Sequence, residues 1–183
     1  MDEQGRDDNG KGKAMETKRL ILRRFLPEDF PAFAELIRNK MASALSVYDQ
    51  QFPTDDKGLR EVLEYIKNLD GFFAVLLKAE RRLIGFVTLH PVGEDTYDFG
   101  YCIHTEYQGK GYATEATISM IAFAKDVLHA RKLSASTAEC NTPSVRLLER
   151  AGFVRVGSGS ASFAKDAQGN PIVFPSLDFE LRL

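Results

Sequence analysis

The segment best suited to chemistry is a glycine-rich loop that precedes a long helical pattern. Its residues are Gln108, Gly109, Lys110, Gly111, Tyr112 and Ala113. The first N–H groups of a helix have no backbone partner, and they carry a partial positive charge. A diphosphate can approach Gly109 and Gly111 closely, because glycine has no Cβ. The loop therefore predicts an anion-binding site, although a tight turn into a helix would show the same residues.

Two common phosphate motifs do not fit this loop. A P-loop requires Gly-x-x-x-x-Gly-Lys-Ser/Thr, whereas Lys110 is followed by Gly111. The dinucleotide fingerprint Gly-x-Gly-x-x-Gly accepts Gly109 and Gly111 but meets Thr114 at its third glycine position. The anion is therefore not predicted to belong to either of these two nucleotide classes.

The elements around the loop form a strand, a loop and a helix in succession. Residues 96–103 alternate as a strand, with Asp98 on the face opposite its tyrosines. The helix over about 111–129 is apolar over a broad surface, as expected of a helix packed on a sheet. A short strand (132–138) follows, and then a short helix with Thr142 expected as its N-cap and Pro143 as its first residue.

Other segments supply the rest of the predicted fold. Helices are expected from about Asp29 to Met41 and from Lys57 to Leu69, and strands at Leu20 to before Pro27, Phe72 to Leu77, Arg82 to Leu89, Phe153 to Phe163 and Val173 to Leu181. Residues 1–15 combine charged residues and glycines with almost nothing apolar, which predicts a disordered tail. Residues 16–183 are expected to form one domain.

Composition restricts the partners and the location. A formal net charge of -2 gives no basic field that would attract nucleic acid or an anionic membrane. The 2 cysteines and 3 histidines are scattered without ligand spacing, so we expect no metal. The sequence shows no signal region and no apolar stretch of about 20 residues. These features predict a cytoplasmic protein.

Four motifs in order resemble the GNAT superfamily of N-acetyltransferases, and its RimJ/RimL-like branch in particular. They are residues 16–23, the pair Gly100-Tyr101, residues 109–116, and the segment from Asn141 to Phe153. Gln108, Gly111 and Ala113 match the Gln/Arg-x-x-Gly-x-Gly/Ala acyl-CoA signature of that superfamily. The resemblance implies an α+β (mixed α/β) fold, with a mostly antiparallel sheet of six to seven strands, a splayed parallel pair and about four helices.

The same resemblance implies the chemistry and the residues that serve it. Acetyl-CoA would be the cosubstrate, bound where the strands ending at Ile103 and near Ala138 splay apart, and its acetyl group would pass directly to an amine. The residues expected to bind it beside the loop are Tyr101, Cys102, Ile103, Asn141 and Ser144. A backbone N–H of Cys102 or of Ile103 would stabilise the oxyanion. Ser144 would donate to the departing thiolate, because Leu148 stands where many relatives have a tyrosine.

The group that removes the proton of the amine is less clearly marked. An alkyl ammonium with a pKa of about 10.4 is nearly all protonated at neutral pH, so a base or a water relay would help. Asp98 is the first candidate and Glu139 the second. A cross-strand hydrogen bond is the alternative role for Asp98. Glu115 is expected to be structural and to reach back to the N-terminal amides of its helix.

The acceptor is predicted only as a class. The resemblance implies a small-molecule amine or a peptide amine, and it is compatible with a homodimer. Residues 157–163 lack the carboxylate that some RimL-type relatives carry there, which argues against a ribosomal-protein acceptor. Two alternatives stay open: a non-catalytic acyl-CoA sensor that keeps the loop without the chemistry, and an unrelated nucleotide-binding domain.

Overall fold

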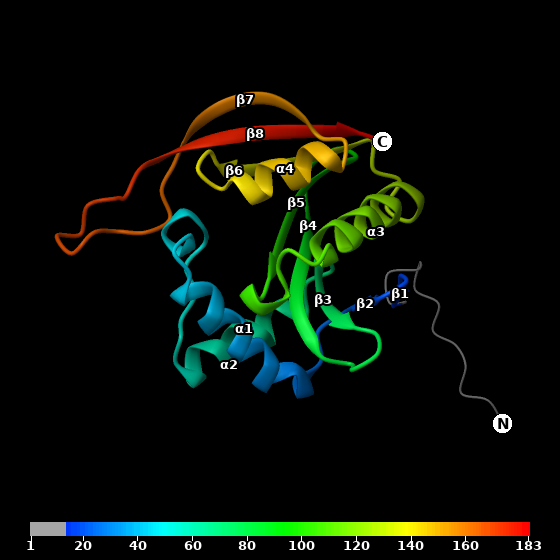
Figure 1. Ribbon diagram of the computed structural model, residues 1–183, viewed down its shortest axis with the longest axis horizontal. Coiled ribbons are helices and arrows are strands. Elements are labelled where there is room, and N and C mark those ends of the chain that lie inside the picture. Colours follow the sequence, from blue (N-terminus) through cyan, green and yellow to red (C-terminus); the bar gives the residue numbers. More distant parts are fainter. Residues whose placement is uncertain (1–13) are drawn as a thin grey trace.

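The computed structural model describes residues 14–183, which form one mixed sheet with helices on both of its faces (Figure 1). Its strands are β1 (Met15–Glu16), β2 (Leu20–Arg23), β3 (Phe72–Leu77), β4 (Leu83–Gly93), β5 (Thr96–Ile103), β6 (Lys132–Ala138), β7 (Val154–Ala161) and β8 (Phe174–Arg182). The helices are α1 (Phe30–Ala42), α2 (Asp56–Ile66), α3 (Tyr112–Asp126) and α4 (Thr142–Arg150). The order across the sheet is β1-β2-β3-β4-β5-β6-β8-β7.

Two hydrophobic cores cover the two faces of the sheet. One core joins the strands to α3 and α4 and is centred on fully buried side chains such as Leu20, Met120 and Leu133. The other core lies between the opposite face of strands β2–β5 and the helices α1 and α2, where Ile37 and Leu59 are fully buried. Apolar residues at helical spacing on α1 and α2 make this packing possible. Figure 1 shows α1 and α2 together on one side of β3 and β4, with α3 on the other side.

The pairing of β5 with β6 is parallel, and it ends early. All other neighbours in the sheet are antiparallel. The α3 crossover makes the β5–β6 pair parallel, as helical crossovers do. Their registered pairs run only from Thr96–Lys132 to Asp98–Ser134, although β5 continues to Ile103 and β6 to Ala138. The two strands therefore separate over their second halves, as the resemblance predicted.

The predicted fold class is confirmed, with differences at its edges. The sheet has eight strands rather than six or seven, because Met15 and Glu16 pair with Leu22 and Ile21 as β1. That strand begins one residue before the expected domain boundary, while residues 1–13 of the expected tail lie outside the described residues. Strand β4 continues to Gly93 because it follows β5 as far as Thr96 across a tight turn. No helix of residues 14–183 is long and apolar enough to cross a membrane.

Candidate active site

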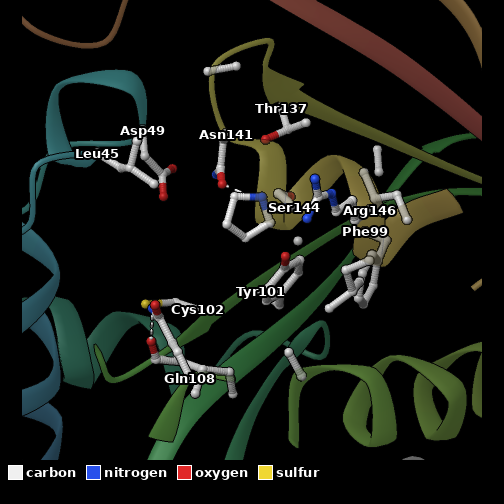
Figure 2. Close-up of a pocket in the computed structure, with 18 of the residues that line it drawn as sticks. Leu45, Asp49, Phe99, Tyr101, Cys102, Gln108, Thr137, Asn141, Ser144 and Arg146 are labelled. Carbon is white, nitrogen blue, oxygen red and sulfur yellow. Dashed lines mark hydrogen bonds between the residues drawn. The ribbon is translucent and has the colours of Figure 1, made fainter. Parts of the chain in front are cut away.

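A cleft of about 1790 Å³ opens where β5 and β6 separate. One wall consists of the second half of β5, the glycine loop and the first turn of α3, and another consists of β6 and the start of α4. The third side is formed by the segment that follows α1, including the 3-10 turn Ser46–Tyr48, and by parts of β7 and β8. Figure 2 shows side chains from these three sides converging on one space.

The glycine loop has the geometry of an anion site. Gly109 and Gly111 both have left-handed backbone conformations, with φ of 72° and 80°, which favour glycine. Gly111 is the N-cap of α3, and no side chain caps this end of the helix. The free amides at the start of α3 therefore face a cleft that Gln108, Gly109, Gly111, Tyr112 and Ala113 line. This arrangement suits a diphosphate.

Lys110 is placed differently from the other residues of the loop. It does not line the cleft, and its ammonium lies 5.4 Å from the centre of the Tyr107 ring. Gln108 is bound to the end of β5, because its Nε2 donates to the carbonyl of Ile103 at 2.8 Å. The loop is thus tied to the end of β5, while the lysine side chain points along the surface.

Glu115 does not reach back to the amides of its own helix, so that expectation is wrong. Its Oε1 accepts hydrogen bonds from Thr17 Oγ1 at 2.6 Å and from the Arg19 backbone N–H at 2.8 Å. Its Oε2 accepts one from Arg19 Nε at 2.6 Å. Burial of this carboxylate acts to raise its pKa, but the hydrogen bonds from Thr17 and Arg19 outweigh it and lower the pKa. Because the Glu115 carboxylate binds Thr17 and Arg19 instead, it leaves the first amides of α3 open to a ligand.

The backbone of β5 presents alternate residues to the cleft. The N–H of His104, just after the strand, donates to Ile84 on β4 at 2.9 Å. Backbone groups alternate in direction along a strand, so the N–H of Cys102 also points toward β4, and those of Tyr101 and Ile103 point toward the gap left by β6. Of the two oxyanion candidates, the N–H of Ile103 rather than that of Cys102 is directed into the cleft.

Two hydroxyl groups meet in the cleft. Tyr101 and Ser144 point toward each other from β5 and α4 (Figure 2), and both line the cleft. Burial raises the pKa of the Tyr101 phenol, and a hydrogen bond with Ser144 opposes that shift. The phenol is therefore protonated at neutral pH and can donate. Leu148, at the position of the family's usual tyrosine, is buried in the wall of the cleft.

The N-cap of α4 is Asn141 and not Thr142, so the expected N-cap was wrong by one residue. The Oδ1 of Asn141 accepts a hydrogen bond from the Ser144 N–H at 3.3 Å as the N-cap of α4. The residue also lines the cleft, so this cap does not exclude contact with a ligand. Its position fixes the first turn of α4 and, with it, the place of the Ser144 hydroxyl.

The two predicted bases lie outside the lining of the cleft. Asp98 stands where the β5–β6 pairing ends, and its Oδ1 accepts a hydrogen bond from Ser134 Oγ at 3.1 Å. This is the cross-strand role considered as the alternative. Glu139 is exposed, and its backbone N–H donates to Pro175 on the β8 side. The structure brings neither carboxylate next to Tyr101 and Ser144.

We expect Asp98→Asn to leave the fold intact and to stabilise it slightly at neutral pH. Burial raises the pKa of Asp98 above its ordinary value of 3.8, with opposition from Ser134 and His90. The folded protein then holds this proton more tightly than the unfolded chain, so stability falls as pH rises above 3.8 and the loss is complete above the raised pKa. An asparagine avoids this loss and still accepts from Ser134.

Urea unfolding of both proteins between pH 3.5 and pH 7 measures the effect. The gain should be no more than about 1 kcal/mol, because Asp98 is only partly buried and solvent screens its charge. A variant that is less stable than the wild type at pH 7 would contradict this description of Asp98.

Three carboxylates that the sequence did not single out line the cleft: Glu16 on β1, and Asp49 and Asp178 on the other sides. Asp49, just after the 3-10 turn Ser46–Tyr48, forms an ion pair with the buried Lys40 at 2.9 Å. Asp178 on β8 accepts a hydrogen bond from Ser136 Oγ at 2.7 Å and is paired in register with Gly157. It therefore stands beside the β7 segment that has no carboxylate of its own. No local motif marks Asp49 or Asp178, since each reaches the cleft only through the tertiary fold.

The thiol of Cys102 lies near one of these carboxylates. Burial raises its pKa to about 12, while the positive charge of Lys40 lowers it and the negative charge of Asp49 raises it. A thiol with this pKa stays protonated at neutral pH and is a poor nucleophile. Cys140 is exposed and does not line the cleft. Neither cysteine is therefore suited to form an acyl intermediate.

Comparison with known proteins agrees with this geometry. A family model described as "Acetyltransferase (GNAT) domain" matches residues 19–154. The SPbeta prophage-derived uncharacterized N-acetyltransferase YokL of Bacillus subtilis is 27% identical over 167 residues, which cover 90% of this chain and 93% of that protein.

Two solved structures share the fold. The acetyltransferase (GNAT family) from Bacillus anthracis has a TM-score of 0.79 at 22% identity, covering 93% of this chain and 98% of its own. The ribosomal-protein-S5-alanine acetyltransferase from Vibrio fischeri has a TM-score of 0.78 at 18% identity, covering 93% of this chain and 96% of its own. Both likenesses concern the fold.

Proposed function

Because this chain belongs to the GNAT family of acetyltransferases, we propose that it transfers an acetyl group from acetyl-CoA to a primary amine. The acceptor is a protein N-terminus or a small-molecule amine, and the transfer is a direct attack in a ternary complex. One observation carries the proposal: the uncapped start of α3 and the separated halves of β5 and β6 open into the same cleft. The cleft thus combines an anion site with free strand edges.

The coenzyme loop and the strands divide the binding of acetyl-CoA between them. The amides from Gly109 to Ala113 suit its diphosphate, and the free edge of β5 suits its pantetheine arm. Bound there, acetyl-CoA supplies an activated acetyl group as a thioester. The protein then needs a donor for the oxyanion, a donor for the sulfur and an acceptor for the proton of the amine.

Two of these tasks have candidates on β5 and α4. The N–H of Ile103 points into the gap and suits the oxyanion, because a fixed backbone donor needs no reorganisation as charge develops. The hydroxyls of Tyr101 and Ser144 suit the sulfur, which leaves as a thiolate with a pKa of about 8.5 by analogy with cysteine. Since Leu148 offers no hydroxyl, this pair replaces the usual tyrosine of the family.

Asp49 is the group best placed to take the proton of the amine. Figure 2 shows its carboxylate on the α1–α2 side of the cleft, facing the side that carries Asn141. Its negative charge acts on the thiol of Cys102, the neighbour of Ile103. It lines the cleft, whereas Asp98 and Glu139 do not. We therefore place the base at Asp49 in preference to the two carboxylates that the sequence suggests.

The two carboxylates on the acceptor side also favour a class of acceptor. Asp49 and Asp178 both line the cleft. An amine that carries a positive charge is attracted to Asp178, and it can share the carboxylate of Asp49 with Lys40. An acceptor with a carboxylate beside its amine, such as a free amino acid, is disfavoured by like-charge repulsion. Peptide N-termini and polyamines fit the cleft better on this ground.

An acceptor panel tests the proposal. Purified protein with acetyl-CoA should release free CoA thiol with at least one member of a panel of polyamines, peptides and amino acids, and the rate should be higher for the first two classes. Mass spectrometry of the acceptor should show one added acetyl group. Because Cys140 is exposed and reacts with thiol reagents, a signal that grows beyond one equivalent of protein is required.

The same panel separates the enzyme from the sensor alternative. If CoA binds but no amine in the panel is acetylated over hours at millimolar concentration, the catalytic proposal fails and a sensor is favoured. If CoA itself does not bind, the site assignment fails as well. Membership of the GNAT family favours acetylation of at least one amine in the panel.

A further inference from the structure

Arg19 connects the coenzyme loop to the segment before β2. This residue lies just before β2, yet its side chain reaches the loop more than ninety positions later in the chain. Its Nη1 donates to the Lys110 carbonyl at 2.9 Å, and its Nε donates to Glu115 Oε2 at 2.6 Å. The guanidinium also lies 4.4 Å from the centre of the Tyr112 ring. The Arg19 side chain therefore contacts the loop and two residues in the first turn of α3, Tyr112 and Glu115.

Thr17 and the backbone of Arg19 complete the attachment. Both donate to Glu115 Oε1, at 2.6 Å and 2.8 Å. Glu115 thus accepts three hydrogen bonds from the segment before β2, and a charged acceptor makes each of them stronger than a neutral one. We call Thr17, Arg19 and Glu115 the clasp. It joins two motifs that are remote in sequence, residues 16–23 and residues 109–116.

The contact with the Lys110 carbonyl sets the direction of the next amide. Every peptide bond in residues 14–183 is trans, and in a trans peptide the C=O and the following N–H point in opposite directions. Because the Lys110 carbonyl points to Arg19, the Gly111 N–H points away from Arg19. Gly111 lines the cleft and Lys110 does not, so this N–H belongs to the cleft side of the loop.

Arg19 also occupies the space next to the Cα of Gly111, where a Cβ would point. A Cβ on Gly111 would lie 3.3 Å from Arg19 Nη2, so the guanidinium is already in close contact with the loop. Since Glu115 neutralises its charge, the clasp can hold the loop without competing as a strong cation for the ligand. Within residues 14–183 no side chain caps α3. Gln108 ties the loop to the end of β5, and Arg19 ties it to the segment before β2.

We infer that the clasp positions the loop amides for the diphosphate of CoA, and that Arg19 and Glu115 are positioning residues. This inference rests on the proposed function, since it requires that the loop bind the diphosphate. A preformed loop loses little conformational entropy when the ligand binds, so the ligand binds more tightly. The clasp therefore acts on coenzyme affinity and not on the acceptor or on the chemical step.

Calorimetric titration of the whole protein with CoA and with 3′-dephospho-CoA tests the inference. Arg19→Met and Glu115→Gln should each weaken both ligands about tenfold, as expected for loss of a hydrogen bond to a charged partner. The double variant should be no weaker than the weaker single variant, because the two residues act as one unit. Arg19→Lys should not restore affinity, since an ammonium cannot reach both Glu115 and the Lys110 carbonyl with a fixed fork.

Lys18→Met is the matched control, because it removes the adjacent exposed cation and should leave both affinities unchanged. Unfolding of each ligand-free variant in urea separates a stability effect from a binding effect. The inference is overturned if folded Arg19→Met binds CoA as the wild type does, or if it loses CoA but not dephospho-CoA, which would indicate a direct contact with the 3′-phosphate. A wild-type protein that binds neither ligand would instead refute the proposed function.

Discussion

Replacing Gly111 by glutamate should lower CoA affinity at least about 100-fold, which corresponds to roughly 3 kcal/mol. Three effects add. The new carboxylate lies at the N-cap of α3, where it competes with the diphosphate for the same free amides. Its negative charge repels the diphosphate at short range. A side chain at φ 80° costs about 1–2 kcal/mol in backbone strain, and its Cβ would press on Arg19.

A second glycine provides a matched control for strain and charge. Gly169 also has a left-handed conformation, with φ of 86°, and nothing lies within 4 Å of an added Cβ. It stands in the turn at 166–170, away from the residues that line the cleft. Gly169→Glu should therefore carry the same strain and the same charge while CoA affinity stays unchanged. Calorimetric titration with CoA, together with circular dichroism of both variants, measures the difference.

Equal CoA affinity in wild-type and folded Gly111→Glu would show that the diphosphate lies elsewhere. That result would remove the basis for the coenzyme site, and with it the proposed function. A loss in both glycine variants would point to general destabilisation and would also refute the specific role of Gly111.

The sequence predicted the elements around the glycine loop well because they are encoded locally. Gln108, Gly109 and Gly111 lie within a few residues of the helix that they begin, and the left-handed glycines follow from the turn that this geometry requires. The parallel pair of strands follows from the helix between them. Local spacing therefore predicts the loop and the helix, whereas the splayed parallel pair was expected from the family resemblance.

The acceptor side could not be predicted in this way. Asp49 reaches the cleft because α1 packs against the sheet, and Asp178 reaches it because β8 lies between β6 and β7. Neither position follows from a period or a motif. Asp98 shows the converse problem: its strand face was predicted correctly, but Asp98 lies where β5 and β6 are still paired and is outside the lining of the cleft. Only the sheet register shows its bond to Ser134. Glu115 found partners almost a hundred residues earlier in the chain, which no local rule anticipates.

Asp49→Asn should lower kcat by about 100-fold at pH 7, the lower end of what a general base contributes. The asparagine has the same shape but cannot accept the proton of an ammonium. The loss should shrink as pH rises toward the pKa of the acceptor, about 10.4 for an alkyl amine, because the amine then loses its proton to solvent. Initial rates between pH 7 and pH 10 with saturating acetyl-CoA measure this change.

Asp98→Asn is the comparison that decides between the two carboxylates, since both variants make the same change of one atom. We expect Asp98→Asn to keep kcat within a few-fold, because its side chain does not line the cleft. The fold should survive in Asp49→Asn as well: the buried Lys40 still donates to the Gln50 carbonyl at 2.9 Å, and the asparagine oxygen can accept from it. Melting temperatures of both variants check this point. If Asp98→Asn is the slow enzyme and Asp49→Asn is not, the base is Asp98, as the sequence first suggested. The proton of the amine must then reach Asp98 along the gap between β5 and β6.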